Sequence, residues 1–284
     1  MLAATCCFFN PMKYKRPVEN WHRFRGALPH ELPLYSIELS FDGEFQTDST
    51  WRVRGTMEDH LMWQKERLLN LAIERVPDRY DKITWLDSDV LFLNDRWVEE
   101  TEAVLDEKPV AQLFETAVML DEEFMPASRS WGVGSALAKG LDAARGHAGL
   151  AWAARRELFP LLDDHILGLA DATMAFAWLG HSDNSFSRRM NRAWRRQYLE
   201  WAQEKYDKVQ GNVGYVSGDV FHLWHGSRAD RKYFTSWTRL AKSGYQPSAH
   251  VRLDSNGLWT WAGDGQHLRT LMRQYFETRR DDGV

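Results

Sequence analysis

The apolar positions in the first third of the chain follow two different periods. The segments "AATCCFFN", closed by Asn10-Pro11, and "LPLYSIELSF", with Glu38 near its end, are almost continuous apolar runs, which are typical of buried strands. The segment "MWQKERLLNLAIERV" instead separates its apolar residues with charges, which predicts an amphipathic helix. The segment "DKITWLDSDVLFL" then predicts another buried strand, and this one carries two acids.

The order strand, helix, strand predicts parallel pairing, and therefore an α/β fold: a three-layer α/β/α sandwich with a mainly parallel sheet. Ligands of such sheets collect beyond the carboxyl ends of the strands. Asp87 and Asp89 lie at such an end, where a carboxylate on a buried strand can meet water and a ligand.

The later part of the chain has a looser pattern. We expect a mobile surface segment at 125–149, a strand turning into a helix at 149–162, a long basic helix at 185–209 and a final helix at 266–280. The whole chain is expected to form one domain. Its expected parts are residues 1–120, residues 121–235 and a C-terminal extension at 236–284.

Composition and charge limit the partners and the cell compartment that we expect for the protein. The formal net charge of −4 argues against a generally basic nucleic-acid coat. Cys6 and Cys7 are adjacent, so no disulfide framework is expected, and a reducing compartment follows. No basic segment precedes the first apolar run, and no apolar stretch approaches bilayer length, so we expect a soluble cytoplasmic protein without membrane contact. The 14 tryptophans are expected mainly in the core, although their rings also stack on sugars and bases.

The Asp-Ser-Asp triplet has two interpretations. Asp87 and Asp89 offer hard oxygen ligands that can share one Mg²⁺ or Mn²⁺ ion, which in turn takes the phosphate oxygens of a nucleotide. The alternative is the polar rim of a buried strand. The apolar runs on both sides of the triplet favour a metal site.

An ordered set of motifs resembles the GT-A glycosyltransferases, a Rossmann-like fold family whose hallmark is an Asp-x-Asp after an apolar strand. Besides the triplet, the set contains the segments "WQKERLLN", "GLAWAARRELF", "DHILGLAD" and "FHLWHG" in the order of galactosyltransferase-like members. The resemblance covers about residues 1 to 235. It implies that 1–120 is a nucleotide-sugar-binding half and 121–235 an acceptor and catalytic half. It implies a glycosyltransferase, either a hexosyl- or a pentosyltransferase, that uses a UDP-sugar donor with Mn²⁺ or Mg²⁺.

The resemblance also implies a metal site. Asp89 would coordinate the metal, and Asp87 would contact the metal or the donor ribose. His222 or His225 would be the third protein ligand. Two histidines at this spacing suit a borderline cation, and Gly226 slightly favours His225 because it lets the backbone approach a diphosphate. For either histidine, an ordinary core or surface position remains open.

The same resemblance places a general base at Asp171, which implies an inverting reaction. The chain departs from the family pattern here, because Gly168-Leu169-Ala170 stands where a run of glycines is expected. The alternative role for Asp171 is a simple helix N-cap.

Position alone assigns the remaining donor contacts. The residues expected to bind the nucleotide-sugar are Asn10, Tyr14, Arg16, Glu38, Lys65, Asp87, Trp152 and Arg228. Arg231 and Lys232 follow Arg228 on a loop that offers phosphate donors or, in the alternative, a solvated basic surface.

A local basic cluster raises the question of the acceptor. It consists of Arg188, Arg189, Arg192, Arg195 and Arg196, with Trp194 and Trp201 close by. On a helix it would track a phosphate backbone while the tryptophans stack on bases, or it would be a solvated face paired with acids. The motifs look most like small bacteriophage glycosyltransferases, some of which are thought to modify hydroxymethylated bases in DNA. DNA is therefore one candidate acceptor, beside a glycan or a small molecule, and a phage origin would place the protein in host cytoplasm.

Two other functions are consistent with parts of the pattern. The missing glycines before Asp171 suit a catalytically degenerate protein that binds a nucleotide-sugar or nucleic acid. A haloacid-dehalogenase-type phosphotransferase also uses Asp-x-Asp after a strand. It expects Thr or Val where Leu91 stands, and its motif usually opens the chain.

Overall fold

A computed structural model describes residues 1–283, with every side chain in that range except that of Arg228. Its centre is a seven-stranded sheet in which four strand pairs are parallel and one strand, β9, runs antiparallel to both neighbours. The strand order is β10 (Val213–Tyr215), β6 (Val110–Gln112), β9 (Ala151–Arg155), β4 (Lys82–Leu86), β1 (Leu2–Phe9), β2 (Leu34–Ser40) and β3 (Trp51–Arg54). The predicted mainly parallel sheet is confirmed.

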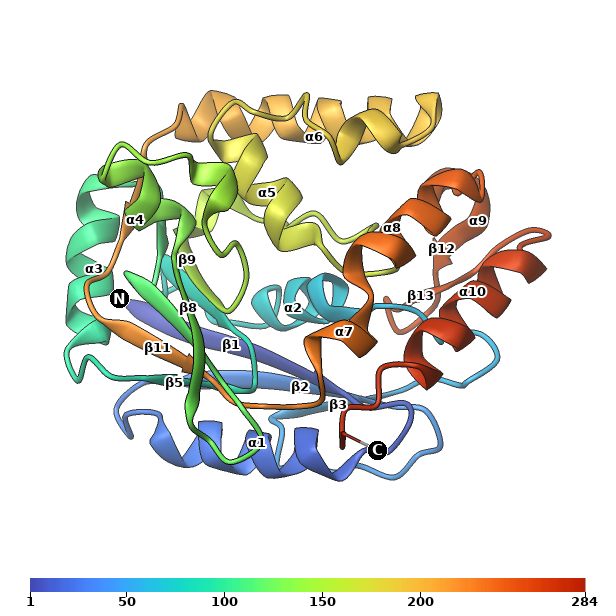
Figure 1. The fold of residues 1–284 in the computed structure, drawn as a ribbon, viewed down its shortest axis with the longest axis horizontal. Helices are drawn as coiled ribbons and strands as arrows, with labels where there is room; N and C mark the ends of the chain where they lie inside the picture. Colours follow the sequence, from blue (N-terminus) through green and yellow to red (C-terminus); the bar gives the residue numbers. More distant parts are fainter. Residues whose placement is uncertain (284) are drawn as a thin grey trace.

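The two faces of this sheet are covered by different helices, as the alternation along β1 shows. Ala3 and Cys7 belong to one buried cluster, whereas Ala4, Cys6 and Phe8 belong to the other. The first cluster includes residues of α2 (Lys65–Ile73), α5 (Ala170–Trp178), α6 (Arg192–Val209), α8 (Tyr233–Lys242) and α10 (Gln266–Glu277). The second includes residues of α1 (Lys15–Ala27) and α3 (Trp97–Glu107). Figure 1 shows α1 and α6 on opposite sides of the sheet, so the predicted three-layer α/β/α sandwich is confirmed.

The apolar run that contains the two acids is not one strand. It is divided into β4 of the central sheet and β5 (Val90–Phe92), which belongs to a second sheet. The order of the second sheet is β5, β11 (Asp219–His222), β7 (Thr116–Leu120) and β8 (Pro126–Trp131). The chain therefore leaves the central sheet at Asp87, and β11 arrives beside β5 in antiparallel register, with His222 opposite Val90.

The segment at 125–149, predicted to contain a mobile surface stretch, contains β8, α4 (Val133–Ala138) and a 3₁₀ turn at Ala143–Arg145. One local prediction is wrong. The basic helix begins at Arg192 instead of residue 185, because the Asn191 side chain accepts hydrogen bonds from the Ala193 and Trp194 amides and so caps α6. Arg188 and Arg189 lie before it in a separate 3₁₀ turn, Ser187–Arg189.

The C-terminal part contains short elements and the predicted final helix, α10, which is confirmed. The remaining elements are the 3₁₀ turn Arg156–Leu158, α7 (Arg228–Arg231), α9 (Pro247–His250), and the hairpin of β12 (Val251–Leu253) and β13 (Trp259–Trp261). After α10 the chain turns back, and its last described residues lie beside the start of α1 (Figure 1). Within residues 1–283, no helix combines the length and apolarity that a bilayer crossing requires.

Candidate metal and sugar-transfer site

The Asp87-Ser88-Asp89 turn is fixed by backbone hydrogen bonds on both sides. The Asp87 amide donates to the Leu150 carbonyl at 2.8 Å, just before β9, and the Asp89 carbonyl accepts from the Leu223 amide at 2.8 Å, just after β11. The turn therefore lies where the two sheets meet. Its two carboxylates, although only two positions apart, have different partners.

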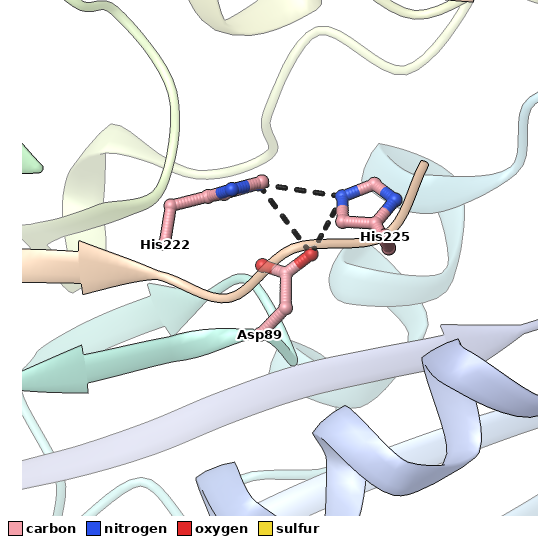
Figure 2. A group of neighbouring side chains, drawn as sticks. All are labelled: Asp89, His222 and His225. Atoms are coloured by element: carbon pink, nitrogen blue, oxygen red, sulfur yellow. Dashed lines mark hydrogen bonds and ion pairs between the residues drawn. The ribbon is translucent and has the colours of Figure 1, made fainter. Parts of the chain in front are cut away.

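Asp89 meets two histidines (Figure 2). Its Oδ2 lies 3.0 Å from His225 Nε2 and 3.6 Å from His222 Nε2, and the two Nε2 atoms are 3.3 Å apart. His222 ends β11, and His225 follows after a short extended segment, so both rings face the turn after β4. These three side chains form the one group within residues 1–283 whose ligand atoms converge as a metal site requires, all within 4.8 Å of one another.

The chemistry of this group fits a divalent cation. Burial lowers the pKa of His222 well below its ordinary value, which leaves a neutral imidazole with a free lone pair. Burial alone would raise the pKa of Asp89, but the nearby imidazoles and Arg231 hold it below the usual value, so the carboxylate is ionised. The Asp89 Oδ1 atom is buried and has no hydrogen-bond partner among the described residues. An unpartnered carboxylate oxygen beside two imidazoles is the donor set of a metal site.

Asp87 instead forms an ion pair with Lys65, which also binds the predicted general base. Lys65 Nζ lies 2.6 Å from Asp87 Oδ1 and 2.9 Å from Asp171 Oδ2. Burial would lower the pKa of the Lys65 amine, but the charges of Asp171 and Asp87 raise it well above its ordinary value. Burial also raises the pKa of Asp87 to about 6. Lys65, expected to contact the donor, therefore bridges two carboxylates, and Asp87 lies outside the metal group.

Asp171 is not a helix cap. The N-cap of α5 is Leu169, which has a left-handed backbone with φ of 67°, and no side chain caps this helix. Asp171 lies in the first turn, with Oδ2 on Lys65 and Oδ1 buried without a partner in the described part of the chain. One oxygen is thus held in place and the other is left to accept a proton.

Two predicted donor contacts are wrong. Glu38 accepts hydrogen bonds from the Gln46 amide at 2.6 Å and from the Thr47 amide and hydroxyl at 3.0 and 2.6 Å, so this carboxylate holds a loop. Trp152 is 1% exposed, and its indole nitrogen donates to the Ala148 carbonyl. It is a core residue because the side chains of β9 are enclosed between the helix layers.

The other predicted donor contacts lie at or near the start of α1. The Asn10 amide nitrogen donates to the Tyr14 carbonyl and to Gln46, and its oxygen accepts from the Tyr14 amide, so Asn10 shapes the loop after β1. Arg16 pairs with Glu19 and lies over the Trp224 ring. Arg228 was expected to contact the donor, but its side chain lies outside the described residues.

The tryptophans near the basic cluster are not placed as stacking on bases would require. Trp194 is fully buried, and Trp201 is half-buried with Lys205 over its ring, so neither is free to stack on a base. Trp194 packs against the rings of His165, Trp237 and Tyr245. The arginines remain at the surface, where Arg188 and Arg195 share Asp183.

Two residues that the sequence did not single out complete the surroundings of the site. Asp281 Oδ1 lies 3.4 Å from His225 Nδ1, and Arg279 Nε donates to Asp281 Oδ2 at 3.0 Å. In the sequence they belong to "TRRDDG", a charged stretch near the end of the chain that is typical of a solvated segment. Arg231, which the sequence did indicate, is buried and donates to the His225 carbonyl.

A comparison with protein-family profiles and with curated protein sequences finds no match. Among solved structures, the chain is similar to Drosophila β1,4-galactosyltransferase 7, with 13% identity, 95% of this chain and 98% of that chain covered, and a TM-score of 0.41. It is also similar to glucosyl-3-phosphoglycerate synthase from Mycobacterium tuberculosis in complex with Mn²⁺, UDP and phosphoglyceric acid, with 12% identity, 92% and 87% covered, and a TM-score of 0.41. A third is S. aureus TarS, with 9% identity, 98% and 71% covered, and a TM-score of 0.39. Similarity of this degree does not establish an activity, so the function must follow from the site itself.

Proposed function

We propose that this protein is a GT-A glycosyltransferase that moves a sugar from a UDP-sugar to an acceptor hydroxyl, with inversion at the anomeric carbon. The observation that carries the proposal is the convergence of Asp89, His222 and His225 at the carboxyl end of β4, beside the half-free carboxylate of Asp171. A cation site and a positioned base at the same end of a mainly parallel sheet suit a substrate with both a diphosphate and a reacting sugar.

Asp89, His222 and His225 would hold the cation, which would neutralise charge on the departing diphosphate. Because two of the three donor atoms are imidazole nitrogens, Mn²⁺ suits this set better than Mg²⁺, which prefers oxygen ligands. Arg231 lies beside them with its Nε buried and without a partner in the described structure, so it can donate to a phosphate oxygen.

Asp171 supplies the general base. Its free Oδ1 accepts the proton of the acceptor hydroxyl while the acceptor oxygen forms a bond to the anomeric carbon. The bond between that carbon and the β-phosphate oxygen breaks, and its electron pair leaves with UDP. Lys65 donates to Oδ2, so Asp171 is oriented before the substrate arrives.

The reaction is tested with a panel of UDP-sugars and Mn²⁺, by measuring the UDP released through slow hydrolysis or transfer. We expect release with at least one donor, and a fall of about 10²- to 10⁴-fold in transfer for Asp171→Asn, the size of a general-base contribution. Transfer at the wild-type rate by Asp171→Asn would contradict the assigned base. Absence of UDP release with every donor and acceptor would contradict the enzyme assignment.

For the acceptor, we propose hydroxymethylated bases of DNA, bound through the arginines before and on α6. A surface hollow of about 800 Å³ is lined by Arg188, Arg192, Arg195 and Arg196, together with Asp183, Glu200 and neighbouring residues. Next to it, Phe234 is 63% exposed and stacks on Phe186, and Arg189 donates to Thr238 of the same helix. An exposed aromatic ring beside clustered arginines suits a nucleic acid with an unstacked base.

The acceptor is identified by mass spectrometry of hydroxymethylated DNA after incubation with mixed UDP-sugars and Mn²⁺. A hexose or pentose adduct on the base supports the DNA acceptor. UDP release without any DNA adduct, accompanied by an adduct on a glycan or small hydroxylated compound, contradicts it while leaving the glycosyltransferase intact.

A second candidate function is binding of a nucleotide-sugar without turnover. Two observations favour it. Lys65 forms ion pairs with both Asp87 and Asp171. Leu169 has a left-handed backbone, which a glycine would adopt without strain. Calorimetric binding of a UDP-sugar with no UDP release under any acceptor would select this function over catalysis.

A further inference from the structure

The last described residues of the chain pack against the candidate metal site. Asp281 and Arg279 are 7% and 5% exposed, which is unusual for charged residues unless they are paired. Asp281 lies against His225, 56 positions earlier, whereas Asp282 lies against the start of α1. The segment 279–283, the C-terminal clasp, therefore connects the first helix with the histidine segment after β11.

Asp281 lies beside the Nδ1 atom of the His225 imidazole and can accept a hydrogen bond from it. Asp281 Oδ1 lies 3.4 Å from Nδ1, while Nε2 faces Asp89 at 3.0 Å and His222. A carboxylate accepts a hydrogen bond from Nδ1–H, and in the neutral ring this leaves the lone pair on Nε2. The ring is thus oriented and polarised as a ligand that presents Nε2 to the group of Figure 2.

Asp281 is itself held by other buried groups. Its Oδ2 accepts from Arg279 Nε at 3.0 Å, and the Arg279 guanidinium donates to the Tyr275 hydroxyl at 2.9 Å. The Arg279 guanidinium also lies over the Trp63 ring. Both carboxylate oxygens of Asp281 therefore have partners, and its position does not depend on His225 alone.

The backbone of the clasp is fixed from two further sides. Gly226, with φ of 84°, lies so close that a Cβ atom there would come within 2.4 Å of the Arg280 carbonyl oxygen. Asp282 accepts hydrogen bonds from the Lys15 amide at 3.1 Å and the Arg16 amide at 2.8 Å, the free donors at the start of α1. The absence of a side chain at Gly226 thus lets the clasp pack closely. Together with the Asp282 hydrogen bonds, this packing holds Asp281 beside His225.

We propose that Asp281 is a positioning residue for the metal centre: it holds His225 with Nε2 directed at the cation. The inference rests on the proposed function, because it presupposes that Asp89, His222 and His225 bind a metal. A metal-ligating histidine usually donates its other N–H to a carboxylate or carbonyl, and loss of such a partner typically costs 10- to 100-fold in metal affinity.

The test measures Mn²⁺ binding to the full chain by isothermal titration calorimetry, without any donor or acceptor. Asp281→Ala is expected to weaken Mn²⁺ binding by about 10- to 100-fold. The isosteric Asp281→Asn is expected to lose less, because an amide oxygen still accepts from Nδ1–H but carries no charge. If Asp281→Ala does not fold, the measurement on Asp281→Asn still tests the proposal.

Asp282→Ala is the matched control. It lies in the same clasp and removes the acceptor for the Lys15 and Arg16 amides, but it has no contact with His225. We expect a lower melting temperature with unchanged Mn²⁺ affinity. Wild-type affinity in both Asp281 variants, or an equal loss in Asp282→Ala, would overturn the positioning role. A wild-type protein that binds no Mn²⁺ would contradict the proposed function itself, and the inference would fall with it.

Discussion

The two acids of the Asp-Ser-Asp triplet belong to different charge networks. Asp89 interacts with two imidazoles and not with a lysine, and burial lowers the pKa of His222, so the charge of Asp89 is left for a cation. Asp87 interacts with Lys65, so its charge is already balanced. Because the chain changes sheets at the triplet, residues two apart do not share a face as they would on one continuous strand. Of the two acids, we therefore assign metal binding to Asp89 and not to Asp87.

Asp89→Ala separates the two acids experimentally. The substitution removes the only carboxylate of the metal group, and we expect Mn²⁺ affinity to fall by at least 10-fold and transfer activity to be lost. Asp87→Ala provides the comparison, because Asp87 contacts Lys65 and not the histidines. Calorimetry with Mn²⁺ checks both variants. Equal Mn²⁺ affinities for the two variants would contradict the separation of roles.

Lys65 is the cation between two buried carboxylates, so its removal should be costly. Lys65→Met leaves Asp87 and Asp171 without their shared partner, and we expect a loss of about 3–5 kcal/mol in the free energy of unfolding. Lys139→Met is the matched control, because Lys139 pairs with Glu115 near the surface and such pairs contribute about 0–1 kcal/mol. Urea denaturation measures both. A loss for Lys65→Met as small as that of the control would show that the bridge is not needed for folding.

At the scale of the elements, α2 presents two buried charged residues in succession. Lys65 faces the site, and Glu66 follows it at 3% exposure, with Oε1 buried and without a partner in the described structure. Burial raises the pKa of Glu66 from its ordinary value of 4.5 to about 8. Helix α2 therefore holds a protonated carboxyl group at neutral pH.

This shift predicts how stability depends on pH. Because the folded protein binds the Glu66 proton more tightly than the unfolded chain does, the resulting stability is fully present below pH 4.5 and is lost as the pH rises toward about 8. Glu66→Gln keeps the shape and removes the titration. The quantity to compare is the melting temperature of the variant minus that of the wild type. We expect this difference to be several degrees larger at pH 8 than at pH 5. Differential scanning calorimetry measures this difference, and an equal difference at both pH values would contradict it.

The elements that the sequence predicted are those whose apolar pattern is local. The continuous runs of β1, β2 and β4 and the helical period of α2 and α10 are properties of single segments, so each could be identified without its partner. The second sheet could not be identified in this way. Its strands have three to six residues, and β11 pairs with β5 and β7 across long sequence separations, although β7 and β8 are neighbours in the chain. In addition, β5 looks like the continuation of β4.

The same distinction applies to the site. Asp89, His222 and His225 were indicated by residue type, spacing and family resemblance, and the structure brings them together. The bridge from Lys65 to Asp171 and the contact of Asp281 with His225 join residues 106 and 56 positions apart. Nothing in the local pattern marks such pairs. Glu38 and Trp152 were assigned by position alone, without information on the hydrogen bonds and packing that occupy them.

At the scale of the whole molecule, the charge is unevenly distributed. The formal net charge is −4, yet the arginines before and on α6 gather around one surface hollow, and α6 lies across one side of the molecule, away from α1 (Figure 1). Two of these arginines are partly neutralised by Asp183, whereas Arg192 and Arg196 are exposed. A polyanion would be attracted to this surface and repelled by much of the rest, and this attraction weakens with salt.

The salt dependence of DNA binding tests this surface directly. Each arginine that neutralises a phosphate contributes about 0.9 to the slope of log K against log salt concentration for duplex DNA. For the triple variant Arg188→Ala, Arg192→Ala and Arg196→Ala, we expect weaker binding and a shallower slope, by as much as about 0.9 per arginine. The control removes the same charge from exposed arginines elsewhere, at Arg25, Arg96 and Arg273, and should change the slope much less. Fluorescence anisotropy with hydroxymethylated DNA over a range of NaCl concentrations gives both slopes. Equal slopes for the two triple variants would show that net charge alone governs the binding and would remove the arginine surface from the proposed acceptor site.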